Sequence, residues 1–96
     1  MGIQTKFTEQ TGVGESVGIL IKDTTDIKIS YMCVVTGTVN YTVQHSLDGI
    51  TYIDNSDNAA QTTNQDGNYV FPVHKVRVKV NSGDGSVKMT IRQLVV

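Results

Sequence analysis

Residues 41–56, YTVQHSLDGITYIDNS, contain the side-chain types from which hydrolases build a catalytic triad. A triad needs a nucleophile, a base and an acid that converge in space. The apolar alternation around His45 predicts a strand, in which neighbouring side chains point to opposite faces, so His45 cannot serve Ser46 as a base. The chain also lacks a G-x-S-x-G motif. We therefore expect a hairpin turning at Asp48-Gly49, with His45 at a strand end, no catalytic residue and no enzymatic activity.

The other nucleophilic and ligand-type side chains predict no cofactor and no metal site. Cys33 is the single cysteine, which excludes a disulfide within the chain, and its alternating apolar surroundings predict a buried thiol. His45 and His74 with one cysteine make a poor zinc set. One loop offers calcium as an alternative, but its spacing departs from the D-x-[DN]-x-[DN]-G pattern, which favours a solvated turn. The oxygen-bearing side chains of that loop are Asp54, Asn55, Asp57 and Asn58.

The elements that must position these residues are strands. Fourteen valines and twelve threonines favour strands, and apolar and polar residues alternate with a period of two. We predict an all-β fold, a single-domain β-sandwich or jelly roll over residues 1–96 with about eight antiparallel strands. The expected strands are residues 4–8, 17–21, 27–35, 39–45, 51–53, 69–73, 76–80 and 87–91, with an edge pairing at 60–62. Turns are expected at residues 36–38, 66–67 and 81–85.

The same alternation predicts which side chains fill the space between the two sheets. One apolar face per strand must be buried, because a shift of one residue would move every side chain to the other face. The expected core residues are Ile19, Ile29, Tyr31, Cys33, Val43, Phe71, Val78, Met89 and Ile91.

Both ends of the chain carry apolar side chains that suit contact with a partner. Gly12 and Gly14 separate the first expected strand from the rest, so residues 1–15 are a candidate arm that could pair with a neighbouring chain. Apolar anchors surrounded by polar groups are typical of interfaces. The predicted partner-binding residues are Ile3, Phe7, Leu94, Val95 and Val96.

Charge and hydropathy argue against several classes of partner. Eight basic and nine acidic residues give a net charge of -1, which argues against a nucleic-acid binder and against an electrostatic membrane anchor. No apolar run approaches a membrane span, and no signal peptide is recognised, so we expect the protein to be made in a cytoplasm. Basic side chains on the polar faces of strands are either solvated or form a basic face for an acidic partner. These side chains are Lys28, Arg77, Lys79, Lys88 and Arg92.

The linear pattern over residues 35–93 resembles small β-sandwich proteins of tailed-bacteriophage virions. In those proteins a Val-x-x-x-Val-Gln-x-Ser-x-Asp-Gly hairpin precedes an aromatic-x-Val-Arg-Val strand and a Gly-Ser-Val-x-x-x-Ile/Leu-Arg strand. The matching residues are Val39, Val43, Gln44, Ser46, Asp48 and Gly49, then Val76, Arg77 and Val78, then Gly85, Ser86, Val87, Ile91 and Arg92.

This resemblance implies a non-enzymatic capsid decoration or cement protein. Such a protein binds the outer capsid surface in the virion, bridges adjacent major capsid subunits and is often a trimer, assembled in the host cytoplasm. The alternatives are another virion component (a tail, fibre or neck protein) and a carbohydrate-binding module. Carbohydrate-binding relatives usually carry an aromatic residue after the Asp-Gly turn, often tryptophan; this chain has no tryptophan, and Tyr52 is the nearest substitute.

Overall fold

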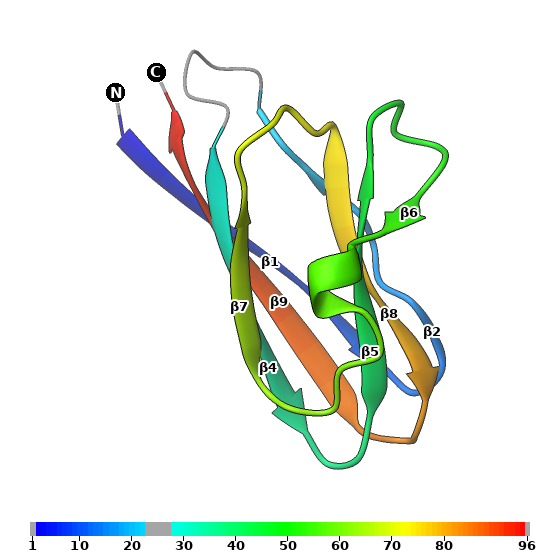
Figure 1. The fold of residues 1–96 in the computed structure, drawn as a ribbon. Coiled ribbons are helices and arrows are strands. Elements are labelled where there is room, and N and C mark those ends of the chain that lie inside the picture. Colours follow the sequence, from blue (N-terminus) through cyan, green and yellow to red (C-terminus); the bar gives the residue numbers. More distant parts are fainter. Residues whose placement is uncertain (1, 23–27, 96) are drawn as a thin grey trace.

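The computed structural model describes residues 2–22 and 28–95, which form nine strands and one short 3-10 helix (Figure 1). No α-helix occurs among these residues, so the all-β prediction is confirmed. The elements are β1 (Gly2–Thr11), β2 (Gly14–Glu15), β3 (Ile19–Leu20), β4 (Ile29–Thr36), β5 (Asn40–Ser46), β6 (Ile53–Asp54), η1 (Ser56–Asn58), β7 (Gln65–Tyr69), β8 (Lys75–Ser82) and β9 (Ser86–Val95).

Two antiparallel sheets pack face to face, which confirms the predicted sandwich (Figure 1). The first sheet has the strand order β1-β9-β4-β7. The second sheet has the order β2-β8-β5-β6, and β3 pairs with β8 further along the same strand. The edge strands β1 and β7 therefore bound the first sheet, and β2, β3 and β6 bound the second.

Residues 2–11 of the candidate arm lie within the first sheet in this structure, and residues 14–15 lie in the second. Residues 2–11 form β1, which pairs with β9 along its whole length, from Gly2 opposite Val95 to Thr11 opposite Ser86. After β1, the Gly12 amide donates to the Gly85 carbonyl at 2.9 Å, and the chain crosses to the second sheet at β2. The N-terminal strand is thus held by the C-terminal one.

The core lies between the sheets and matches the alternation of the sequence. The inward rows of β4, β5, β8 and β9 are buried, and Ile29 is only 2% exposed. All but one of the predicted core residues are buried, namely Ile19, Ile29, Tyr31, Cys33, Val43, Val78, Met89 and Ile91. The prediction for Phe71 is wrong, because its side chain is 46% exposed. It lies beyond the end of β7 and packs edge-on against the rings of Tyr69 and His45.

The strand predicted at residues 69–73 is also wrong in position. β7 runs from Gln65 to Tyr69, so the Asp66-Gly67 pair that predicted a turn lies inside a strand. Gly67 is opposite Tyr31 in the register, and a methyl group at Gly67 would overlap the Tyr31 hydroxyl. A close tertiary contact therefore explains this glycine, and Pro72 follows in an irregular segment where it needs no ladder hydrogen bond.

The other expected strands and turns are present, some with changed bounds. The strand expected at residues 17–21 is reduced to β3, Ile19–Leu20. The turn at residues 36–38 and the loop near residue 83 are present, and both Gly37 and Gly83 have positive φ. Gln61 bridges Tyr41, which confirms the expected edge pairing. The strand expected at residues 51–53 is shifted to Ile53–Asp54. Residue 27, the first of the expected long third strand, lies outside the described residues.

Candidate functional site

Ser46 and Asp48 stabilise the hairpin turn that the sequence predicts, and His45 lies near the end of strand β5 before it. β5 and β6 pair as a hairpin, with His45 opposite Ile53, and Gly49 has a positive φ. Ser46 Oγ donates to Asp48 Oδ1 at 3.0 Å, and the same carboxylate oxygen accepts the Ile50 amide at 2.8 Å. Asp48 also accepts the Thr51 amide, and these hydrogen bonds hold its pKa at about 2. The carboxylate therefore closes the hairpin loop.

His45 belongs to a separate aromatic cluster on the inner side of β5. Its Nδ1 lies 3.0 Å from the Tyr69 hydroxyl, and its ring packs edge-on against Tyr69 and Phe71. Burial lowers the pKa of His45 and raises that of Tyr69. Ser46 points to the opposite face of the strand, where it is buried in the hairpin turn. The two side chains cannot act as a base and nucleophile.

Cys33 and the tyrosines around it form an uncharged interior. The Cys33 side chain has no exposed surface, which confirms the predicted buried thiol, and burial raises its pKa to about 12. Burial likewise raises the pKa of Tyr31 to about 12 and that of Tyr41 above its usual value. None of these groups is ionised near neutral pH, so they suit packing and hydrogen bonding.

The amide-rich loop considered for calcium closes the open side of the sandwich between β5 and β7. Asn55 Oδ1 accepts a hydrogen bond from the Asp57 amide at 3.1 Å and so caps η1. The Asn55 Nδ2 group donates to the Tyr31 hydroxyl at 2.9 Å. Asn58 is buried and accepts a hydrogen bond from the same hydroxyl. Over residues 2–22 and 28–95, no group of three or more histidine, cysteine and acidic side chains could hold a metal ion.

The predicted partner-binding residues converge on the paired terminal strands. Ile3 lies opposite Leu94, and Val95 lies opposite Gly2. Ile3 is exposed and Leu94 is partly exposed, while Val96 lies outside the described residues. Phe7 is 63% exposed on the same outer face, with the Lys88 ammonium 4.4 Å from its ring centre.

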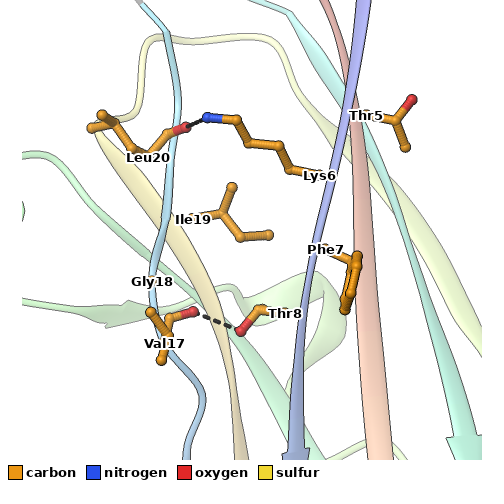
Figure 2. Close-up of a pocket in the computed structure, with 8 residues that line it drawn as sticks. All are labelled: Thr5, Lys6, Phe7, Thr8, Val17, Gly18, Ile19 and Leu20. Carbon is orange, nitrogen blue, oxygen red and sulfur yellow. Dashed lines mark hydrogen bonds between the residues drawn. The ribbon is translucent and has the colours of Figure 1, made fainter.

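A groove runs beside β1, where the edges of the two sheets meet without forming a ladder (Figure 2). Lys6 Nζ donates to the Leu20 carbonyl at 3.2 Å, and Thr8 Oγ1 donates to the Val17 carbonyl at 2.7 Å. The cavity between these segments is about 430 Å³. It is lined by Thr5, Lys6, Phe7, Thr8, Val17, Gly18, Ile19 and Leu20. Two polar side chains therefore hold the sheet edges together and leave an apolar-rimmed groove open.

Sequence reasoning missed four exposed apolar residues on this side of the molecule. Val17, 83% exposed, and Leu20 flank the groove because the second-sheet edge is interrupted between β2 and β3. Met32 and Val34 are exposed on the outer face of the first sheet, where Met32 shares a row with Phe7. For Met32 and Val34, the unbroken apolar run YMCVV at residues 31–35 was the available signal, since such runs indicate strands with two apolar faces.

The basic residues considered for a single basic face lie on different sheets. Lys88 and Arg92 are in β9 of the first sheet, whereas Arg77 and Lys79 are in β8 of the second. Lys28 immediately precedes β4. The alternative of one basic face shared by all five residues therefore does not hold, although β8 has a basic row of its own.

Comparisons with known proteins bear on the fold. No protein-family model matches the chain, and no curated protein sequence does. A solved structure described as "Bacillus endospore appendages form a novel family of disulfide-linked pili" contains a similar chain, with a TM-score of 0.52 and 18% identity. The match covers 99% of this chain and 88% of that one. At this identity the likeness shows a shared fold. Among the described residues, no helix is long and apolar enough to cross a membrane.

Proposed function

We propose that the chain is a non-enzymatic structural protein that attaches to neighbouring protein subunits of a larger particle. In its most specific form, the particle is a phage capsid, and the partner is the major capsid protein whose adjacent subunits this chain bridges. The observation that carries the proposal is β1, a ten-residue edge strand that bears exposed Ile3 and Phe7 beside an apolar-rimmed groove.

β1 suits attachment because it combines backbone and side-chain contacts. An edge strand has a row of unpaired N–H and C=O groups that a strand of another chain can pair. Phe7 and Ile3 would supply the apolar centre of such a contact, with Thr5 and Glu9 beside them on the same face. A single small domain offers limited area, so a homotrimer that engages several subunits at once would raise the affinity.

Immunogold labelling of particles from cells that carry the gene tests this proposal. Label over the capsid shell supports a decoration protein, and label over a tail or neck indicates another virion component. Absence of label from every particle would contradict both.

Point variants test the attachment surface better than deletion, because removing β1 would take away an edge strand that pairs with β9. Phe7→Glu should reduce particle occupancy at least about tenfold, because it places a charge at the centre of the apolar surface. Ile50→Glu is the matched control, since Ile50 is 84% exposed in the β5–β6 hairpin. Equal occupancy of both variants would exclude β1 as the attachment surface.

A subunit of a filament is the second candidate, and the fold shared with a chain from a pilus structure favours it. The first sheet has four strands that are antiparallel to their neighbours, so its edges β1 and β7 run in opposite directions. A second copy of the chain, related by translation, could therefore place its β7 beside β1 of the first copy and continue the antiparallel sheet. If this contact repeats from copy to copy without closing into a ring, the result is a filament. Cys33, the single cysteine, is fully buried, so such a filament would not be linked by disulfides in this fold.

Sedimentation and electron microscopy separate the two candidates. Concentration-dependent filaments of the purified chain, abolished by Phe7→Glu, would favour the filament subunit. A monomer or trimer that stays the same size over the accessible concentration range would exclude it.

A further inference from the structure

The outer face of the second sheet carries a basic row that the attachment surface does not use. Lys75, Arg77 and Lys79 alternate along β8, and all three are partly exposed. The neighbouring outward row of β5 is neutral and buried, consisting of Thr42, Gln44 and Ser46. Within residues 2–22 and 28–95, the structure gives the three cations no ion-pair partner.

Arg77 is held rigidly at the centre of this row. Its Nε donates to Gln44 Oε1 at 2.8 Å, and the Gln44 amide donates to Asp54 Oδ1 at 2.7 Å. The Tyr52 ring covers the guanidinium, with the central carbon 3.7 Å from the ring centre. These contacts occupy Nε and one face of the group. The two terminal nitrogens have no hydrogen-bond partner in the described part of the chain.

We propose that Arg77 is a carboxylate-binding anchor for an acidic, extended segment of a partner protein. The two terminal nitrogens of a guanidinium form a fork that matches the two oxygens of a carboxylate. Because the stacked ring and Gln44 already fix the side chain, binding loses little rotamer freedom. Lys75 and Lys79 lie about 7 Å from Arg77 along the strand, so acidic residues at alternate positions of an extended segment would meet all three cations.

The surrounding charges favour a protein segment over a nucleic acid. The basic row is confined to one strand, and the chain has a net charge of -1, whereas nucleic-acid binders normally present a broad basic surface. Glu15 lies opposite Lys79 and makes one end of the row less positive. The inference goes beyond the proposed function and does not depend on it, because the site would bind a free acidic peptide whatever particle contains the chain.

An NMR titration of the ¹⁵N-labelled chain with the blocked hexapeptide acetyl-TETETE-amide tests the proposal. We expect saturable shifts of the Arg77 Nε–H and Tyr52 ring signals, and about a tenfold weaker affinity for Arg77→Lys, which keeps the charge but loses the fork. Arg92→Lys on the other sheet should bind like the wild type. If Arg77→Lys loses the native spectrum, the double variant Lys75→Gln/Lys79→Gln replaces it and should bind at least about threefold more weakly.

Several outcomes would overturn the proposal. One is an unchanged affinity of the folded Arg77→Lys variant for the acidic peptide. If Arg77→Lys does not fold, an unchanged affinity of the Lys75→Gln/Lys79→Gln variant has the same meaning. Others are binding of the matched acetyl-TQTQTQ-amide peptide with equal affinity, and shifts spread evenly over the basic side chains of both sheets. Tighter binding of a hexathymidine oligonucleotide would show that the site takes phosphate.

Discussion

At the scale of single residues, Asp48, His45 and Cys33 serve the architecture, and their pKa values show how. Asp48 is held at a pKa of about 2 by hydrogen bonds from the hairpin backbone and from Ser46. Its contribution to stability is present above pH 3.8, the ordinary pKa of the group, and is lost as the pH falls toward 2. His45 and Cys33 show the opposite effect, in which burial favours the neutral form.

His45 should make the protein less stable in mild acid. Burial lowers its pKa in the native state, so the unfolded state binds more protons just below the ordinary value of 6.5. The free energy of unfolding should therefore fall as the pH drops through 6.5. Urea denaturation at several pH values measures this slope. His45→Gln should flatten it, and an unaltered slope in His45→Gln would contradict the assignment.

Cys33 should react with thiol reagents only when the protein unfolds. A pKa of about 12 against an ordinary 9.0 lowers the thiolate fraction roughly a thousandfold, and the side chain is fully buried. Labelling with Ellman's reagent in buffer and in urea compares the two states. Leu47→Cys places a thiol at an exposed position and should react rapidly in both. Rapid native labelling of Cys33 would show that the sheets open.

At the scale of elements, the connections are determined by backbone contacts as much as by turn propensity. The loop between β8 and β9 packs against the β4–β5 turn: the Gly85 amide donates to the Thr38 carbonyl at 3.0 Å. Side chains at Gly83 and Gly85 would overlap the carbonyl oxygens of Thr38 and Thr36, respectively. The glycine-rich composition of this loop therefore allows two turns to pack closely.

Three glycine-to-alanine variants should separate backbone strain from steric overlap. Gly12 has a φ of +72° and open space around it, so Gly12→Ala should cost about 1–2 kcal/mol through strain alone. At Gly85, an added methyl group would overlap the backbone, but φ is not positive. At Gly83, the methyl group would overlap the backbone and φ is also positive. Thermal unfolding should rank Gly83→Ala as the most destabilised. Equal stability of Gly83→Ala and Gly12→Ala would contradict the packing of the two turns.

At the scale of the whole molecule, stability comes from the buried inner faces of the two sheets. Ile29 is in β4 and is 2% exposed, so Ile29→Ala should lower the free energy of unfolding by about 2–5 kcal/mol. Ile50→Ala makes the same chemical change at an exposed position and should alter it by less than about 0.5 kcal/mol. Chemical denaturation of both variants provides the measurement, and similar losses would contradict the sandwich core.

Period-two alternation was enough to predict the sandwich and most of its core, because it reports directly which side of a strand is buried. It could not show that Asp66-Gly67 lies in a strand, since that depends on the Tyr31 side chain from a distant segment. For the site, the apolar termini indicated Ile3 and Phe7. The groove was not predictable, because it arises only where β1 meets the segment that contains Val17 and Leu20.

The pairing of Gly2 with Val95 also determines how the domain would respond to a mechanical load. Tension applied between these two residues pulls β1 and β9 apart from one end, so their hydrogen bonds break one after another. Tension along β1 from a neighbour that pairs with its free edge would instead load many hydrogen bonds simultaneously. We therefore expect the fold to yield at low force when stretched between its ends, and to resist much higher force when sheared along β1.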